Sequence, residues 1–331
     1  MFDIEKHAGV GRVGAEVRDG LIKRGYDVIT MALNNTNHLA YSKYIFMDIK
    51  RKLPQADVYI AQSPMETIWL PKNKTIAIVH DLIPLLHPNL AGANMNANPI
   101  KTFLGSRVYW FGAYQASRCK RIIVNSQMTK KEIVGYFKIN PDKVKQYDLG
   151  VREDLDYHPK LDNVFRIGYL GQLDRRKRVN LLIEAFKNTD INGELVIAGF
   201  GPDKEKLQAL AGDDKRIKFL GFVSDDNLCD FYNSLSLFCF PTAVEGWGIP
   251  ITEAMACKKL VLILADAIIP VELKRRCEDW TSVETFSDTL NYYFKGAWDG
   301  SIESNYQFAH SLKWSKFVDG IENEIREVVN G

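Results

Sequence analysis

The sequence lacks several features that would assign it to a class at once. No stretch approaches the ~20 uninterrupted apolar residues of a membrane-spanning helix, and the N-terminal MFDIEKHAG has no apolar core of a signal peptide. The five cysteines form neither a CxxC pair nor a His-rich zinc pattern. They are expected to be reduced thiols that mostly serve packing, and no metal site is predicted. These features indicate a protein that stays inside the cell.

An excess of charge of one sign is also missing. The 43 basic and 41 acidic residues give a net charge of +2, which favours no polyanionic partner such as nucleic acid. No GxxxxGK[ST] occurs, so a P-loop is excluded as a phosphate cradle. With 331 residues, 46% hydrophobic and 25% charged, the chain has the composition of an ordinary globular protein with room for two domains.

Short apolar segments alternate with helix-like segments along two stretches of the chain. Expected strands in the first stretch are 26–31, 58–61, 75–79, 121–125 and 144–147, with helices at 44–52, 100–119 and 128–137. Expected strands in the second are 166–170, 194–198, 217–220, 235–240 and 260–264, with helices at 179–186, 203–210, 225–233 and 252–256. Such alternation predicts α/β domains with parallel sheets, whose ligands bind beyond the carboxyl ends of the strands.

The segment 150–165 is charged, contains a proline and has no periodicity, which predicts a linker. Its Asp154 and Asp156 form a DxD, which we interpret as solvated charge because it follows no strand. The expected domains are therefore 1–150 and 151–310. An amphipathic helix over 314–329, within a last segment 311–331, completes the chain.

The most informative stretch is Pro241 to Cys257, which reads PTAVEGWGIPITEAMAC. It predicts a strand, a glycine-rich turn and a helix, with Glu245 in the turn and Glu253 one turn into the helix. Backbone N–H groups near Gly248 and Ile249 would face an anionic ligand, while the carboxylates would accept from hydroxyls. This pattern suggests a phosphorylated sugar. The simpler alternative is a helix start whose acids are incidental.

Three further turns of the second domain are loaded with small or basic residues. They are 171–178, 199–202 and 221–223, and each follows an expected strand, so all should meet at one edge of the sheet. Lys177, with Arg175, Arg176 and Arg178 around it, is the natural counter-charge for a diphosphate.

A formal GxGxxG occurs at residues 9–14 and suggests a nicotinamide-dependent oxidoreductase. That motif needs a preceding apolar strand and an acid at the end of the next strand. Here acidic residues precede the motif, and the next expected strand runs into asparagines. We therefore interpret Gly9 and Gly11 as part of a small-residue turn that feeds a helix N-terminus, where backbone can approach a phosphate or sugar.

Two features of the first domain allow more than one interpretation. His80 and Asp81 directly follow an expected buried strand and could belong to a site, or Asp81 could form an Asx turn beside a hydrogen-bonded His80. The helix 100–119 is unusually aromatic and is followed by Lys120 and Arg121. It could face an acceptor or a membrane surface, but a buried helix with cations at its C-terminal end is favoured.

Taken in order, these motifs resemble those of the retaining glycosyltransferases of family 4, which have the GT-B fold. The resemblance covers most of residues 8–265 and the last helix. It rests on the segments AGVGR, IVHDLIPLLHP, VNSQMTKKEIVGYFKINPDKV, GYLGQLDRRKRVNLLIEAF, VIAGFGPDKEKL, FLGFVSDDNL and, most specifically, EGWGIPITEA. The HDLIP segment is frequent among members that transfer mannose.

This resemblance implies two Rossmann-like domains facing a cleft, with the C-terminal helix crossing back to the N-terminal acceptor domain. It also implies roles for residues of the donor domain. Glu245 would contact the transferred sugar and Glu253 the ribose of a nucleotide diphosphate sugar, GDP- or UDP-linked. Lys177, with the backbone of Gly248 and Ile249, would hold the diphosphate.

Further roles follow from the same resemblance. Gln172 stands where the family usually has a phosphate-binding arginine, and Arg178 where it has a glycine. Phe222 and Val223 would border the base, and Gly9 and Gly11 would face the donor. His80 would sit beside the sugar and the acceptor hydroxyl.

The implied reaction is a metal-independent transfer of a hexose to a glycan, lipid or small-molecule acceptor, with no cofactor beyond the donor and with peripheral membrane contact possible. One alternative remains open, namely a donor-binding protein of the same fold that has lost catalysis and acts as a scaffold. Gln172 and the short segment ahead of Gly9, which leaves little room for a first strand, are its support.

Overall fold

The computed structural model describes residues 2–3, 9–32, 49–90, 99–159, 162–280, 282–295 and 301–330. The chain folds into two compact units. The first contains residues 1–89, 97–150 and 313–331, and Val151–Leu312 make up nearly all of the second. The chain thus passes from one unit to the next after Gly150, and its last helix belongs with the first unit.

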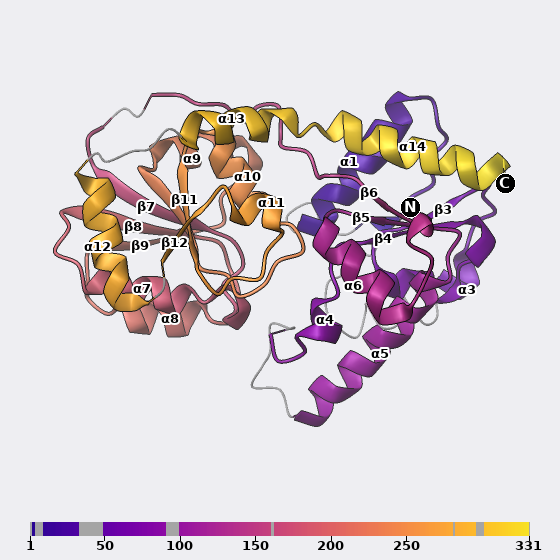
Figure 1. Cartoon of the computed structure of the whole chain (residues 1–331), viewed down its shortest axis with the longest axis horizontal. Coiled ribbons are helices and arrows are strands. Elements are labelled where there is room, and N and C mark those ends of the chain that lie inside the picture. Colours follow the sequence, from indigo (N-terminus) through magenta and orange to yellow (C-terminus); the bar gives the residue numbers. More distant parts are fainter. Residues whose placement is uncertain are drawn as a thin grey trace. The chain divides into compact units, whose positions relative to one another are not determined.

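The first unit is built on parallel strands, as its alternating pattern predicts (Figure 1). A four-stranded sheet has the order β3-β4-β5-β6 and a two-stranded one pairs β1 with β2. The strands are β1 Phe2–Asp3, β2 Met31–Ala32, β3 Tyr59–Ala61, β4 Thr75–Val79, β5 Arg121–Val124 and β6 Val144–Gln146. Every residue of β4 is buried, so this strand forms the centre of the unit's core.

Helices of this unit lie close to their expected positions. They are α1 Gly9–Lys23, α3 Ile49–Lys52, α4 Ile83–Leu86, α5 Pro99–Ser117, α6 Gln127–Phe137 and α14 Trp314–Asn330, with 3-10 turns at Pro64–Trp69, Lys72–Lys74 and Pro141–Lys143. Residues 44–48 of the expected helix 44–52 lie outside the described residues. The first strand is present and very short: Phe2 pairs with Met31 in a parallel register.

Two expectations for the first unit are wrong. A strand was expected over 26–31, but β2 covers only Met31–Ala32, and residues 26–30 pair with no other strand. The GxGxxG residues do not form a turn ahead of a helix, since α1 already begins at Gly9. Gly9 and Gly11 therefore lie in its first turn, where backbone N–H groups have no intrahelical acceptor.

The last helix, α14, fastens onto the first unit along α1, where the two run side by side (Figure 1). A Cβ at Gly20 would come within 2.7 Å of Val318, so the glycine allows the two helices to approach closely. Glu324, which is buried, accepts hydrogen bonds from Arg121 Nε at 3.0 Å and from the Tyr147 hydroxyl at 2.8 Å. The C-terminal helix thus packs against β4 and β5, two strands formed much earlier in the chain.

Helix α5 departs from the expectation of a buried aromatic helix. Trp110, Phe111 and Tyr114 are 38%, 42% and 38% exposed, and the rings of Trp110 and Tyr114 stack at 5.5 Å. Tyr109 lies on the other side and donates its hydroxyl to the Asp81 carbonyl at 2.9 Å. Aromatic content alone could not separate these faces, because only the contacts of the folded unit decide which side is covered.

The second unit is a six-stranded parallel sheet with the order β12-β11-β10-β7-β8-β9. Its strands are β7 Phe165–Leu170, β8 Gly193–Ala198, β9 Ile217–Gly221, β10 Leu237–Phe240, β11 Leu260–Leu264 and β12 Glu278–Trp280. The first five match expected strands to within two residues at each end. Strand β12 is the sixth strand and lies at the edge of the sheet. The sequence did not predict it, because the alternating pattern weakens after Ala265.

Helices cover both faces of this sheet (Figure 1). They are α7 Val179–Lys187, α8 Lys204–Ala211, α9 Leu228–Ser234, α10 Ile249–Ala256, α11 Val271–Lys274, α12 Val283–Phe294 and α13 Ser301–Ser311, with 3-10 turns at Arg175–Lys177 and Asp225–Asn227. Helix α7 packs against α8 and α12, and α10 packs against α13. The arrangement is a doubly wound α/β sheet.

The segment expected to be a linker is packed rather than free. Val151 and Leu155 are buried, and Asn233 fixes the backbone by accepting from His158 N and donating to the Asp156 carbonyl, both at 2.8 Å. The five cysteines are all free thiols, and Cys119, Cys239 and Cys257 are buried. Within the described residues, no helix is long and apolar enough to cross a membrane.

Candidate functional site

The strand order of the second unit places a reversal point between β7 and β10. Reading outward from this point, the chain winds one way through β8 and β9 and the other way through β11 and β12. Sheets of this kind bind ligands just outside the carboxyl ends of the two strands at the reversal. The loop 171–178 leaves β7 there, and the loop 241–248 leaves β10.

The small-residue turns of this unit meet at that edge, as the sequence predicts. Gly171 N donates to the Ala198 carbonyl at 3.1 Å, and Gly199 N donates to the Gly221 carbonyl at 2.7 Å. Gly199 has φ +127°, and a Cβ there would lie 1.8 Å from the Gly171 carbonyl oxygen. Only glycine fits at this position, because the three loops are laid against one another through their backbones.

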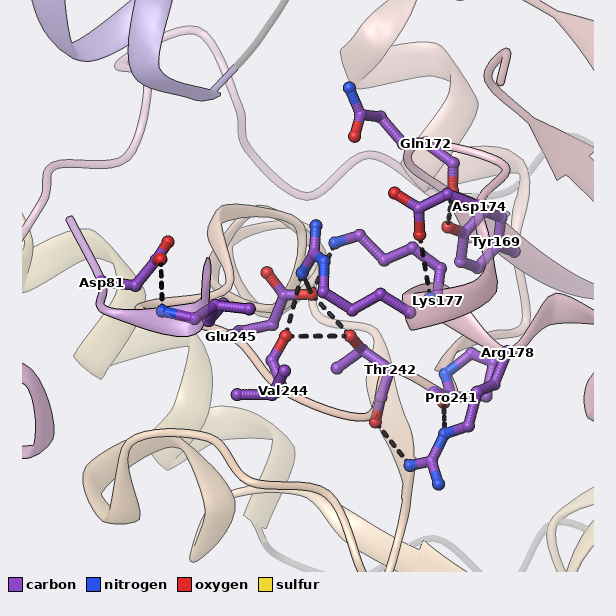
Figure 2. Close-up of polar contacts among 12 residues, drawn as sticks. Asp81, Tyr169, Gln172, Asp174, Lys177, Arg178, Pro241, Thr242, Val244 and Glu245 are labelled. Atoms are coloured by element: carbon purple, nitrogen blue, oxygen red, sulfur yellow. Dashed lines mark hydrogen bonds and ion pairs between the residues drawn. The ribbon is translucent and has the colours of Figure 1, made fainter. Parts of the chain in front are cut away.

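At the centre of this edge, Lys177 reaches Glu245 across the reversal point (Figure 2). The Lys177 Nζ donates to Glu245 Oε1 at 2.6 Å, and both side chains are buried. Two more donors converge on the same oxygen: Arg176 Nη1 at 2.6 Å and the Thr242 hydroxyl at 2.5 Å. One carboxylate oxygen therefore receives three hydrogen bonds, two of them from cations.

These contacts set the ionisation of the pair. Burial raises the pKa of Glu245, but the charges of Lys177 and Arg176 outweigh it and bring this pKa to about 2. Burial lowers the pKa of Lys177, and the Glu245 carboxylate opposes that shift. The Lys177 ammonium also lies 4.5 Å from the centre of the Phe240 ring, which favours the cation. Two cationic side chains, Lys177 and Arg176, thus meet one carboxylate oxygen, while the buried Asp174 carboxylate accepts from the Lys177 backbone N–H at 3.1 Å.

Arg178 has a structural task that the sequence did not reveal. Its backbone is left-handed, with φ +50°, a conformation that favours the glycine found at this position in the resembled family. Its guanidinium donates to the carbonyls of Pro241 and Thr242 at 3.0 and 2.8 Å and to both oxygens of Asp266. These bonds tie the two loops of the reversal point together.

The turn ahead of α10 has the expected form. Gly248 is left-handed with φ +107° and directly precedes Ile249, the first residue of the helix. Glu253 is buried in the second turn, where its Oε2 accepts from the Tyr232 hydroxyl at 2.9 Å. The first backbone N–H groups of α10 and the Glu253 carboxylate thus belong to one short element beside the Lys177–Glu245 pair.

Three other predicted residues lie in the neighbouring loops. Gln172 is exposed, and its carbonyl accepts from the Tyr169 hydroxyl at 2.7 Å. Phe222 is half exposed at the end of β9, and its ring lies 6.5 Å from that of Phe200. Val223 follows it in the same turn. The two exposed phenylalanines form an apolar shelf on this edge of the sheet.

The predicted residues of the first unit lie after β4 and at the start of α1. His80 follows β4, and burial lowers the pKa of its ring to about 4, partly opposed by a hydrogen bond to the Gln62 backbone. Asp81 Oδ1 accepts from Ile83 N at 2.9 Å, which is the Asx turn considered as an alternative. Gly9 and Gly11 begin α1, as described above.

The DxD aspartates are paired by protein groups rather than fully solvated. Asp154 accepts from Arg152 Nε at 2.8 Å, and Asp156 accepts from the Tyr306 hydroxyl at 2.7 Å. Across the part of the chain that the structure describes, no cluster of His, Cys, Asp and Glu has a geometry suited to a metal ion.

Sequence reasoning missed the residues that hold the two glutamates. Thr242 and Tyr232 each donate to one of them, from positions three and 21 residues away. Thr242 lies within the motif and could have been found from it. Tyr232 lies on a different helix, and no sequence pattern links it to Glu253.

A family model described as Glycosyl transferases group 1 matches residues 152–276, which contain the whole reversal point. Over 227 residues, or 61% of this chain, the sequence is 26% identical to the serotype-specific mannosyltransferase WbdA of Escherichia coli. It is also 26% identical over 159 residues to the O-antigen chain mannosyltransferase B of Escherichia coli, covering 42% of this chain and 41% of that protein.

The chain spans about a quarter of the length of the WbdA protein, since the matched segment covers 26% of the WbdA sequence. The whole fold has solved counterparts. HepE of Anabaena, in complex with UDP and glucose, aligns with a TM-score of 0.72 at 15% identity over 98% of both chains. WaaG, a glycosyltransferase involved in lipopolysaccharide biosynthesis, aligns with a TM-score of 0.72 at 15% identity over 100% of this chain and 99% of its own. The fold is therefore GT-B.

The buried ion pair makes a prediction about stability. Glu245→Ala leaves Lys177 buried beside Arg176 without a counter-charge, which is expected to lower the free energy of unfolding by about 3–5 kcal/mol. The double variant Glu245→Leu/Lys177→Met removes both buried charges and should recover most of this loss. Chemical denaturation of the wild type and the two variants measures both effects. Equal stability of Glu245→Ala and the wild type would contradict the pair's structural role.

The same pair predicts a pH dependence. Because the folded-state pKa of Glu245 lies below its ordinary value of 4.5, the ionised carboxylate stabilises the fold above pH 4.5. This contribution is lost as the pH falls from 4.5 towards 2. In the double variant that contribution is absent, so its unfolding free energy should fall less steeply across this window.

Proposed function

We propose that the protein is a retaining glycosyltransferase of the family 4 type, which moves a hexose from a nucleotide diphosphate sugar to a glycan, lipid or small-molecule acceptor. The observation that carries the proposal is the position of Lys177 and Glu245. They lie at the reversal point of a doubly wound sheet, beside the N-terminus of α10 and inside residues 152–276, which the glycosyl transferases group 1 model matches.

The donor's diphosphate is the natural ligand of this edge. Its negative charge matches the cationic side chains of Lys177 and Arg176 and the backbone N–H groups of Gly248 and Ile249 at the start of α10. Compensating the charge on the leaving diphosphate weakens the sugar–phosphate bond, so electrostatics and positioning supply most of the catalysis. We infer that this reaction needs no metal ion, because the protein's own cations perform that compensation.

Glu245 acts on the sugar rather than as one half of an acid/base pair. Its Oε1 is taken by three donors, which leaves Oε2 for hydroxyls of the transferred hexose and for the positive charge that develops at its anomeric carbon. Attack from the face that the diphosphate leaves retains the configuration, and the leaving oxygen takes the acceptor's proton. His80 is proposed to contact the sugar and the acceptor hydroxyl.

The remaining predicted residues would hold the nucleotide. Glu253, held by Tyr232, would accept hydrogen bonds from the ribose hydroxyls. Phe222 and Val223 would border the base, which belongs to GDP or UDP. Gln172 would contact the diphosphate through a neutral amide, and the backbone of Gly9 and Gly11 would approach the donor. The relatives named mannosyltransferases support mannose as the hexose, and the HepE complex supports UDP as one candidate nucleotide.

Proton NMR of the product tests this proposal. The protein is incubated with GDP-mannose, UDP-glucose or UDP-galactose and a panel of methyl hexosides, and the expected product is an α-hexoside formed from an α-linked donor. Glu253→Gln, which keeps the size of the side chain, should raise the KM of the donor about tenfold with a smaller change in kcat, because it weakens a charge-assisted bond to the ribose. Inverted products would contradict retention, and tight donor binding without turnover would favour the scaffold alternative.

We also propose that the protein is cytoplasmic and touches the inner membrane surface through α5. The exposed rings of Trp110, Phe111 and Tyr114 are of the amphipathic kind that settles at a bilayer interface. Arg118 lies 5.8 Å from the Tyr114 ring and continues this row. It also lines a surface groove of about 670 Å³ whose cations are Lys72, Arg118, Lys120, Arg121, Lys143 and Lys145.

An apolar row that ends in a cationic groove matches an anionic lipid surface in both hydrophobicity and charge. Not every cation is equally available: Lys72 and Lys143 donate to backbone carbonyls, and Arg121 pairs with Glu324 and Glu327. Arg118, Lys120 and Lys145 are thus the proposed lipid contacts.

Vesicle sedimentation tests the membrane contact. The protein should bind vesicles of phosphatidylglycerol and phosphatidylethanolamine more strongly than vesicles of phosphatidylcholine, and less at high salt. Lys120→Ala and Lys145→Ala should each weaken binding about fivefold, and Trp110→Ser/Phe111→Ser should weaken it further. The matched control is Tyr292→Ser, at an aromatic residue of the second unit that is 56% exposed. Equal loss in this control, or equal binding to neutral vesicles, would overturn the assignment.

A further inference from the structure

Three polar side chains stand at the carboxyl ends of neighbouring strands in the first unit. Gln62 directly follows β3, His80 follows β4 and Asn125 follows β5. The pairing of Val79 with Val124 puts His80 beside Asn125, one strand spacing apart. The His80 ring is hydrogen-bonded to the backbone of Gln62, so the three residues form a continuous row at this edge.

The functional atoms of this row are buried and have no hydrogen-bond partner. They are Nε2 and Oε1 of Gln62, Nε2 of His80 and Oδ1 of Asn125. Gln62 is 1% exposed and Asn125 3%. Four of the side-chain atoms in this condition among the described residues lie in this row. Chance burial of polar atoms would not gather them at the one edge where a parallel sheet binds ligands.

Other polar side chains near this row do have hydrogen-bond partners within the protein. The Thr67 hydroxyl donates to the Pro64 carbonyl at 2.7 Å, and Ser126 Oγ accepts from Thr129 N at 3.1 Å. Glu66 accepts from the backbone N–H groups of Gln62 and Ser63. The backbone of Gln62 is therefore fixed while its amide is left unused, at an expense in stability that a ligand would offset.

Electrostatics around the row select against a charged ligand. The amides carry no charge, and burial keeps His80 neutral at physiological pH by lowering its pKa to about 4. Asp81, an acid, directly follows His80, and burial together with the Asp81 charge raises the pKa of Glu132 to about 7. A phosphate or carboxylate would meet Asp81 here without an ion-pair partner in the row.

We propose that Gln62, His80 and Asn125 form a subsite for an uncharged, hydroxyl-bearing sugar ring of the acceptor, with Gln62 and Asn125 as its specificity-determining residues. This inference rests on the proposed function. A hydroxyl both donates and accepts, and a carboxamide offers one group of each kind, so two amides and a neutral imidazole match neighbouring hydroxyls of a pyranose. His80 is the part-exposed member of the row.

Apolar replacements of nearly equal size separate a binding role from a structural one. In Gln62→Leu and Asn125→Leu the unsatisfied atoms disappear, so the melting temperature should stay the same or rise. Each variant should nevertheless bind the sugar about 3- to 10-fold more weakly, as expected for the loss of one or two neutral hydrogen bonds. The matched control is Thr67→Val, which removes a satisfied buried hydroxyl and should lower the melting temperature without changing sugar affinity.

Saturation-transfer NMR with a panel of methyl hexosides supplies the affinities, and the donor's affinity is measured in parallel by calorimetry. The expected result is binding of at least one methyl hexoside in preference to its 6-phosphate, with a loss in both leucine variants and unchanged donor affinity. Unchanged sugar affinity in both variants, a lower melting temperature in both, or a preference for the phosphate would overturn the subsite. If sugars bind as expected but no transfer occurs with any donor, the proposed function fails while the subsite stands.

Discussion

The ion pair between Lys177 and Glu245 is the interaction on which the rest of the candidate site depends. It joins the loop after β7 to the loop after β10, the two strands at which the sheet reverses direction. Arg176 and Thr242 complete the same contact, and Arg178 ties the same two loops through their carbonyls. A pair buried this deeply is stable only when every charge has its partner, so the geometry of the edge is fixed before any ligand arrives.

This constraint explains why the pair is suited to a diphosphate and not to acid/base chemistry. Glu245 has its pKa brought to about 2, so it remains an anion and cannot act as a proton donor near neutral pH. What the cluster offers instead is a fixed arrangement of two cationic side chains, Lys177 and Arg176, around one carboxylate oxygen. Such preorganised charge is what a leaving phosphate needs, since it costs no rearrangement at the moment of reaction.

The two units use the carboxyl edges of their sheets in opposite ways. In the second unit, buried charges are paired and the small-residue loops are locked together through their backbones. In the first, the edge carries neutral polar atoms that are left unsatisfied at Gln62, His80 and Asn125. The contrast fits the chemistry proposed for each unit, which is a charged leaving group for the second and neutral hydroxyls for the first.

Much of the fold follows from local pattern, because strands such as β4 and β11 are unbroken apolar runs bounded by polar turns. The apolar pattern does not predict strands that are only partly buried. Strand β12, at the edge of the sheet, consists of Glu278, Asp279 and Trp280, and its two acidic residues break the apolar run that would mark a strand. The same limit applies to α5, whose aromatic residues fall on both a covered and an exposed face.

For the site, the motif located Lys177, Glu245 and Glu253, but not how they are held. The partner of Glu253 is Tyr232, which comes from another helix. Arg178 has a left-handed backbone, a conformation that an arginine rarely adopts. Both arise from contacts between segments that are distant in the sequence. Only the folded unit determines them.

Titration calorimetry with UDP, GDP and NAD tests whether Lys177 binds the diphosphate of a nucleotide. We expect that at least one of the two nucleoside diphosphates binds, that Lys177→Met weakens this binding at least tenfold through the loss of a charge-assisted contact to phosphate, and that NAD does not compete. Binding of NAD with neither UDP nor GDP, or diphosphate binding that is indifferent to Lys177→Met, would contradict this expectation.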